Sequence, residues 1–165
     1  MIYVSKKLKW LGVIASSVIL FFVIFSGVID TIPRYKVEIE KMPIIFNVDA
    51  RNTSYFIRQN ISPNDMILAT TTHLNLVSSL AGRPTVVGFP GWLWTKGIDY
   101  SSRELDLKSF YLNPIINLGI ADKYMARYVL IDPTAIYDWG VDKKIFDDNF
   151  KKLFSSGGYD LYDLE

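Results

Sequence analysis

The N-terminal part of the chain carries one long uncharged run of apolar residues. Residues 11–29 read LGVIASSVILFFVIFSGVI, and as a helix this run of about 19 residues would span roughly 28 Å. That length matches the hydrocarbon core of a bilayer and exceeds the usual apolar core of a cleaved signal peptide, which is the competing interpretation. Pro33 is expected to end the helical segment. The run therefore predicts one transmembrane helix, with the lipid bilayer as its partner.

The charges around this run predict how the chain is oriented. Residues 1–10 contain three lysines, so the positive-inside rule places them in the cytoplasm and carries the C-terminal part across the membrane. Residues 30–48 are expected to form a connector, in which KVEIE alternates as a short strand or an extended link would. Residues 49–165 then form one extracytoplasmic domain.

Beyond the connector, the spacing of apolar positions alternates between that of helices and that of strands. Helical spacing and turn residues predict helices over 50–59, 72–81, 103–111, 114–123 and 143–154. Short apolar or alternating runs between turn residues predict strands over 66–70, 84–89, 126–131 and 159–164. Strands that alternate with helices favour a small α/β domain with a mostly parallel, Rossmann-like sheet and flanking helices.

The composition narrows the chemistry that this domain can perform. The 165 residues include no cysteine and one histidine, which excludes disulfides, thiol catalysis and a zinc site with several histidines. We therefore expect no metal and no cofactor. The formal net charge is +1, so nucleic-acid binding has no electrostatic support. The sequence contains no GxGxxG fingerprint, Walker loop or nucleophile elbow.

Two candidate binding segments lie at the second predicted helix, one in its first turn and one just after its end. His73 and Asn75 follow the first predicted strand, and ligands of open α/β sheets bind beyond the carboxyl ends of strands. A loop or capping histidine is the structural alternative. Arg83 lies in a tight Gly-Arg-Pro turn, where it can bind a phosphate or carboxylate or can pair with an acid of the fold.

The loop over residues 88–104 combines glycines with aromatic and charged side chains. Trp92, Trp94 and Tyr100 offer flat faces that suit sugar rings or a protein interface. A hydrophobic mini-core, or a face resting on the membrane, is the alternative. Charged residues at the end of the loop suit acid–base chemistry or favourable charges at a helix start; they are Asp99, Arg103 and Glu104.

The segment THLNLVSSLAGRPTVVGFPGWLWTKGIDYSSRE resembles the C-terminal extracytoplasmic region of multi-pass membrane proteins of the GT-C type, which are similar to dolichyl-phosphate-mannose mannosyltransferases. The pattern is a histidine, a Gly-Arg turn, a strand and a loop rich in glycine and tryptophan that ends in Arg-Glu. It is carried by His73, Gly82, Arg83, Gly88, Phe89, Gly91, Trp92, Leu93, Trp94, Gly97, Tyr100, Arg103 and Glu104. With ARYVLID and FSSGGYDLYDL downstream, the resemblance covers roughly residues 40–165.

The resemblance implies a non-catalytic tail or accessory domain. Proteins of this type carry many membrane helices and place their catalytic acid in an early loop, a region that this sequence does not include. The resemblance therefore implies contact with a polyprenyl-linked sugar or with a multi-pass membrane subunit. One alternative is an autonomous membrane-anchored enzyme that uses His73 and nearby carboxylates. A pocket that brings together His73, Arg83 and Glu104 would favour this alternative. A structural protein-interaction module is the other.

Overall fold

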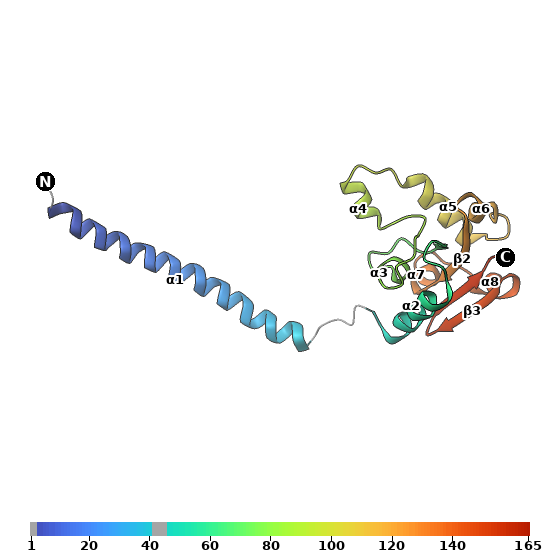
Figure 1. Ribbon diagram of the computed structural model, residues 1–165, viewed down its shortest axis with the longest axis horizontal. Helices are drawn as coiled ribbons and strands as arrows, with labels where there is room; N and C mark the ends of the chain where they lie inside the picture. Colours follow the sequence, from blue (N-terminus) through green and yellow to red (C-terminus); the bar gives the residue numbers. More distant parts are fainter. Residues whose placement is uncertain (1–2, 41–45) are drawn as a thin grey trace. The chain divides into compact units, whose positions relative to one another are not determined.

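The computed structural model describes residues 3–40 and 46–165, with side chains described for residues 10–29, 31–32 and 46–165. The chain divides into two compact units, Met1–Ile44 and Ile45–Glu165. Helix α1 (Tyr3–Glu40) forms the first unit, and the other elements form the second (Figure 1). The predicted connector over 30–48 thus lies partly in α1 and partly outside the described residues.

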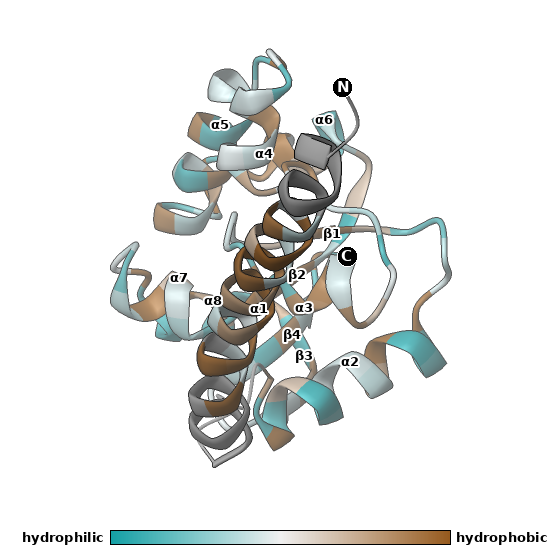
Figure 2. Cartoon of the chain, turned by 90° about the vertical axis from the view of Figure 1, so that its left-hand side faces the viewer, coloured by the Kyte–Doolittle hydropathy of each residue, from teal (hydrophilic) through white to brown (hydrophobic). Residues whose placement is uncertain are grey.

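Helix α1 contains an apolar stretch, Trp10–Ile29, of 20 residues, none of which is buried. Figure 2 shows this stretch as brown, hydrophobic ribbon. The stretch is long and apolar enough to cross a membrane. The helix continues through Pro33 to Glu40, so the prediction that Pro33 ends it was wrong. A proline has no backbone N–H, so it removes one helical hydrogen bond and strains one turn. A long helix can continue past it because the hydrogen bonds before and after that turn remain.

The second unit is built on a four-stranded sheet of order β1-β2-β4-β3. Within the described part of the chain, β1 pairs with β2 in parallel, while β4 is antiparallel to both β2 and β3. The α/β class is confirmed, but the expectation of a mostly parallel, Rossmann-like sheet was wrong, because most of its strand pairs are antiparallel. The strands are β1 (Met66–Leu68), β2 (Ala126–Ile131), β3 (Lys151–Ser156) and β4 (Tyr159–Asp163).

The antiparallel part arises from a β3–β4 hairpin, where the sequence predicted one helix over 143–154. Helix α8 (Lys143–Asn149) ends at Phe150, whose backbone is extended at φ −127° and ψ 150°. Gly157 and Gly158 then adopt φ of 51° and 92°. Two consecutive residues with positive φ form the tight turn of a hairpin, so these glycines do not cap a helix.

A bulge in β3 explains why this segment had the spacing of a helix. The strand register shifts between Lys152 and Phe154, which leaves Leu153 as an extra residue. Leu153 and Phe154 both pack against the same core. Two consecutive apolar residues on one side are unusual for a regular strand, whereas the bulge makes them compatible with one.

The strand predicted over 84–89 is reduced to a single parallel bridge between Ile67 and Thr85. Ile67 N donates a hydrogen bond to Pro84 O at 3.1 Å. Val86 and Val87 are nevertheless buried, so the apolar run reflects packing and not strand pairing. The other three predicted strands are confirmed as β1, β2 and β4.

Helix α2 (Val48–Asn60) follows the predicted range of 50–59 closely. Its N-cap is Asn47, whose Oδ1 accepts a hydrogen bond from Ala50 N at 2.7 Å. Of the remaining helices, α3 and α6 are shorter than predicted, α5 is slightly longer, and α4 and α7 arise where no helix was predicted. Their bounds are α3 (Leu76–Ser79), α4 (Pro90–Thr95), α5 (Ser101–Leu112), α6 (Gly119–Lys123) and α7 (Pro133–Tyr137).

The sheet separates two hydrophobic cores. Residues of α2 and α3 pack with one face of the sheet, including Leu130 and Leu161. Residues of α5 and α8 pack with the other face, including Val129 and Tyr162. Successive residues of β2 and β4 therefore point to opposite cores, as the pleat requires. Both faces are covered near the centre of the sheet, so the surfaces left for binding are its ends and the segments around them.

Candidate functional site

An aromatic cluster forms around the start of α4. The ring of His73 lies 4.9 Å from that of Phe89 and 4.9 Å from that of Trp92, while Phe89 and Trp92 are 5.9 Å apart. All three pairs meet edge to face, the arrangement that the ring quadrupoles favour. The cluster joins His73 to two residues that lie 16 and 19 positions later in the sequence, and we name His73, Phe89 and Trp92 the aromatic platform.

The local backbone explains how the platform is held. Phe89 precedes α4, and Pro90 takes the first helical position, where its missing N–H is of no consequence. A Cβ atom on Gly91 would lie 2.6 Å from the Phe89 ring, so glycine is required for the ring to rest there. Leu93 packs against the core and thereby anchors α4 to the rest of the domain. Trp92 is left 57% exposed, and its ring is available to a ligand.

Trp94 and Tyr100 lie apart from the platform. Trp94 is 73% exposed, and none of the described ring pairs includes it. Tyr100 precedes α5 and packs against the core that contains Leu107 and Phe110. Trp94 is therefore a second exposed aromatic on α4, and Tyr100 has a packing role.

Asn75 belongs to a buried polar cluster at the carboxyl ends of β1 and β2. Its Oδ1 accepts a hydrogen bond from Val77 N at 2.8 Å and so caps α3, while its Nδ2 donates to Thr70 O. The Thr70 hydroxyl donates to the Asp132 carboxylate at 2.6 Å. Asp132 also accepts from Ala135 N at 2.8 Å and caps α7. The cluster fixes the strand ends, and both polar atoms of the Asn75 side chain are engaged within the fold.

Burial raises the pKa of the Asp132 carboxyl above its ordinary value of 3.8, against the opposing effect of the Thr70 hydroxyl. As pH rises above that ordinary value, the unfolded chain loses its proton first, and the folded state becomes less favoured. We expect Asp132→Asn to remove this trend, so that the variant gains stability relative to the wild type as pH rises. Denaturant unfolding across that pH range measures the gain in the free energy of unfolding.

The control for this prediction is Asp142→Asn, because Asp142 caps α8 in the same way but is exposed. That variant leaves the buried Asp132 in place, so it should keep the pH trend that Asp132 causes. An unchanged trend in Asp132→Asn would show that the buried carboxyl does not titrate as proposed.

Arg83 is used within the fold. Its Nε and Nη2 donate to Ile61 O at 3.1 and 2.7 Å, and Nη2 also donates to Arg58 O at 3.1 Å. Its Nη1 donates to Ala81 O at 3.0 Å. The guanidinium thus binds carbonyl groups at the end of α2, where a cation is favoured. The phosphate-binding interpretation of Arg83 gains no support from this geometry.

The charged residues around the start of α5 act locally. Asp99 accepts a hydrogen bond from Ser101 N at 3.0 Å, which lowers the pKa of the Asp99 carboxyl. Glu104 pairs with Lys108 one turn later at 3.2 Å, and Arg103 is exposed. No hydrogen bond or ion pair among the described residues joins His73 to Arg83 or Glu104. Of the sequence-predicted residues, the structure therefore brings together only His73 and Trp92.

Sequence reasoning did not select Phe89, Gly91, Thr70 or Asp132 as site residues. Phe89 and Gly91 are part of the pattern that carries the resemblance. The contact of the Phe89 ring with Gly91 depends on the backbone of α4, which the sequence does not show. Asp132 had a usable signal, because Asp-Pro after a strand is typical of a helix cap followed by a first-position proline.

No family model matches the chain, and neither does any curated protein or solved structure. The resemblance to GT-C-type tails therefore stays a prediction from the residue pattern. The function has to be inferred from the geometry of the platform, the use of the polar groups and the apolar helix.

Proposed function

We propose that this chain is a membrane-anchored, non-catalytic domain that holds the sugar of a polyprenyl-linked donor on its aromatic platform, as an accessory or tail domain related to GT-C-type glycosyltransferases. The observation that carries the proposal is the exposed Trp92 ring, which His73 and Phe89 hold from the side. Isolated surface apolar residues need no explanation, but a supported and exposed tryptophan is typical of a binding surface.

Sugar rings suit such a surface for a physical reason. A pyranose presents C–H groups on its face, and these carry a slight positive charge that is attracted to the negative face of an aromatic ring. Trp92 also needs no large rearrangement to bind, because the platform contacts limit its side-chain freedom. The ordering cost of binding is reduced accordingly.

The polar side chains support a binding role over catalysis. General acid–base chemistry needs a titratable group that is placed at the substrate and free to exchange a proton. Asn75, Arg83 and Glu104 instead use their polar groups within the fold. His73 contacts aromatic rings and lies beside no described carboxylate that would orient it.

The apolar helix supports a location beside lipid-linked substrates. Trp10–Ile29 is long and apolar enough to cross a bilayer, which would keep the second unit close to the membrane surface. The positive-inside rule favours the outer side for that unit. Since the chain has no cysteine, one cysteine placed at exposed Ser102 can be labelled in intact cells with an impermeant maleimide, and no labelling would contradict the outer location.

The proposal is tested by titrating the full chain in nanodiscs with a polyprenyl-phosphate hexose and recording tryptophan fluorescence. We expect a saturable change that is much weaker with the sugar-free polyprenyl phosphate. Trp92→Ala should weaken binding about tenfold, the equivalent of about 1.4 kcal/mol of lost contact. Tyr137→Ala, which removes an aromatic side chain that is 83% exposed on α7, is the matched control and should bind as the wild type does.

Two outcomes would contradict the proposal. An equal response to the hexose and to the sugar-free phosphate would show that the platform contacts lipid and not sugar. No response from a folded chain would favour an interaction module without a small-molecule site.

A further inference from the structure

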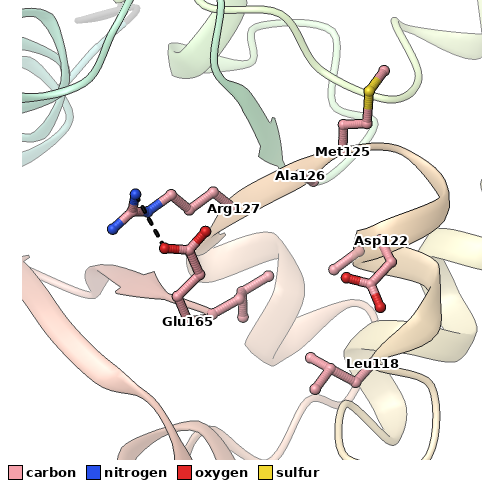
Figure 3. A pocket seen from close by; sticks show the side chains of 8 residues that line it. Leu118, Asp122, Met125, Ala126, Arg127 and Glu165 are labelled. Atoms are coloured by element: carbon pink, nitrogen blue, oxygen red, sulfur yellow. Dashed lines mark ion pairs between the residues drawn. The ribbon is translucent and has the colours of Figure 1, made fainter.

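A hollow that shares no residue with the aromatic platform lies between α6 and the adjoining ends of β2 and β4. Its volume is about 420 Å³, within the range of pockets that hold a ligand or a partner's side chain. Figure 3 shows Leu118, Asp122, Arg127 and Glu165 arranged around it. Its lining consists of Leu118, Ala121, Asp122, Met125, Ala126, Arg127, Leu164 and Glu165.

The charges around the hollow leave an excess of carboxylates. Arg127 is already bound, since its Nε and Nη2 donate to Asp163 at 3.2 and 3.1 Å and its Nη1 pairs with Glu165 at 3.1 Å. Asp122 forms no side-chain ion pair among the described residues, and its neighbour Lys123 pairs with Asp106 at 2.6 Å. The lining itself therefore carries two carboxylates, those of Asp122 and Glu165, and one guanidinium, that of Arg127, which is also held by Asp163 outside the lining. The hollow is complementary to a positive charge.

Met125 stands at the rim with unusual exposure and an unusual backbone. It is 86% exposed, and its φ of 53° is the one positive φ of a non-glycine residue in the described part of the chain. A side chain in this region costs about 1–2 kcal/mol, and glycine would avoid that cost. Figure 3 shows the thioether extending away from Leu118, out of the hollow. A flexible apolar side chain held outward at such a cost is typical of a binding surface.

The segment before α6 exposes two further apolar side chains. Ile115 and Ile116 are exposed, the latter by 83%, in the turn between α5 and α6. The turn is ordered by Asn117, whose Nδ2 donates to Ser109 O at 2.9 Å and to Asn113 O at 3.0 Å. The hollow thus combines apolar walls, an apolar rim and a negative charge.

We propose that this hollow binds a segment of a partner protein in which a lysine or arginine is flanked by apolar side chains. The aliphatic stem of such a residue would lie along Leu118 and Leu164, and its cationic head would reach the carboxylates of Asp122 and Glu165. The flanking apolar residues would contact Met125 and Ile116. This proposal is independent of the sugar-binding role of the aromatic platform.

The test uses the full chain in nanodiscs with methyl-¹³C-methionine, and the Met125 methyl group as reporter. The probes are two peptides, acetyl-Leu-Lys-Leu-Leu-amide and the matched peptide with glutamate in place of lysine. We expect the lysine peptide to shift the Met125 signal saturably. The signal of Met66, on β1, serves as a check of the fold in the peptide-free variants. The glutamate peptide should bind at least about tenfold more weakly, and Asp122→Asn should weaken binding of the lysine peptide about three- to tenfold.

Asp148→Asn, an exposed aspartate on α8, is the charge-matched control and should bind as the wild type does. Asp122 is exposed, so its substitution should leave the fold intact, which unshifted Met66 would verify. Equal affinity for both peptides would overturn the proposal, as would an unaffected Asp122→Asn variant or the absence of any Met125 shift.

Discussion

Replacement of Tyr111 by alanine is expected to lower the free energy of unfolding of the second unit by about 3–5 kcal/mol. Tyr111 lies on α5 and is fully buried, with its ring in edge-to-face contact with Trp139 at 5.2 Å. Its hydroxyl donates to Leu130 O at 2.7 Å and lies 3.1 Å from Leu68 O, so it links the ends of β1 and β2. The alanine variant loses both the packing and this link, which denaturant unfolding of the full chain would measure.

Tyr111→Phe separates the two contributions. It keeps the ring and removes the hydroxyl, so we expect a loss of about 1–2 kcal/mol. Tyr137→Ala, at an exposed site on α7, should change stability by less than about 0.5 kcal/mol. If phenylalanine proved as costly as alanine, the hydroxyl link and not the ring would dominate. A small effect of alanine would refute the packing argument.

Gly157→Ala is expected to cost about 2–4 kcal/mol of unfolding free energy. The φ of 51° at Gly157 already disfavours a side chain. A Cβ there would also lie 2.1 Å from the Asp49 carboxyl group and 2.7 Å from its Cβ. Asp49 is held in place because it accepts a hydrogen bond from the Ser156 hydroxyl at 2.8 Å. Comparison of urea midpoints between variant and wild type would measure the loss.

Gly158→Ala is the matched control. Gly158 has a φ of 92°, but a Cβ there meets no atom closer than 3.9 Å, so only backbone strain of about 1–2 kcal/mol is expected. The steric part can be isolated further, because Asp49→Gly removes the atoms that a Gly157 side chain would strike. Gly157→Ala should therefore cost less in that background. An equal cost in both backgrounds would exclude the clash.

The sequence predicted those helices and strands whose buried residues follow the regular spacing of a helix or a strand. Helix α2 has buried residues at helical spacing, and β2 and β4 have apolar or alternating runs. The β3 strand was missed because Leu153 and Phe154 are adjacent on one face, which only the bulge opposite β4 permits. The sheet type was missed for the same reason, since the antiparallel pairing depends on that hairpin.

The sequence selected Trp92 of the candidate site correctly, but it did not show which polar residues are used within the fold. Trp92 was selected because a tryptophan in a glycine-rich loop stands out in sequence, and the structure places it beside His73. Arg83 has the same sequence signature as a ligand-binding arginine, but its partners are backbone carbonyls at the end of α2. Backbone acceptors have no sequence signature, so the structural use of Arg83 and Asn75 was not visible.

The parallel pairing of β1 with β2 has a consequence for the order in which the chain folds. Met66 pairs with Ala126, sixty residues later in the sequence. At a synthesis rate of about 5–20 residues per second, β1 waits about 3–12 s for its partner strand. During this interval Ile67 depends on sequence neighbours such as Ile57, Leu76 and Val77, which lie in the core shared by α2 and α3. Early protection of the nascent chain from aggregation therefore rests on the α2–β1–α3 segment.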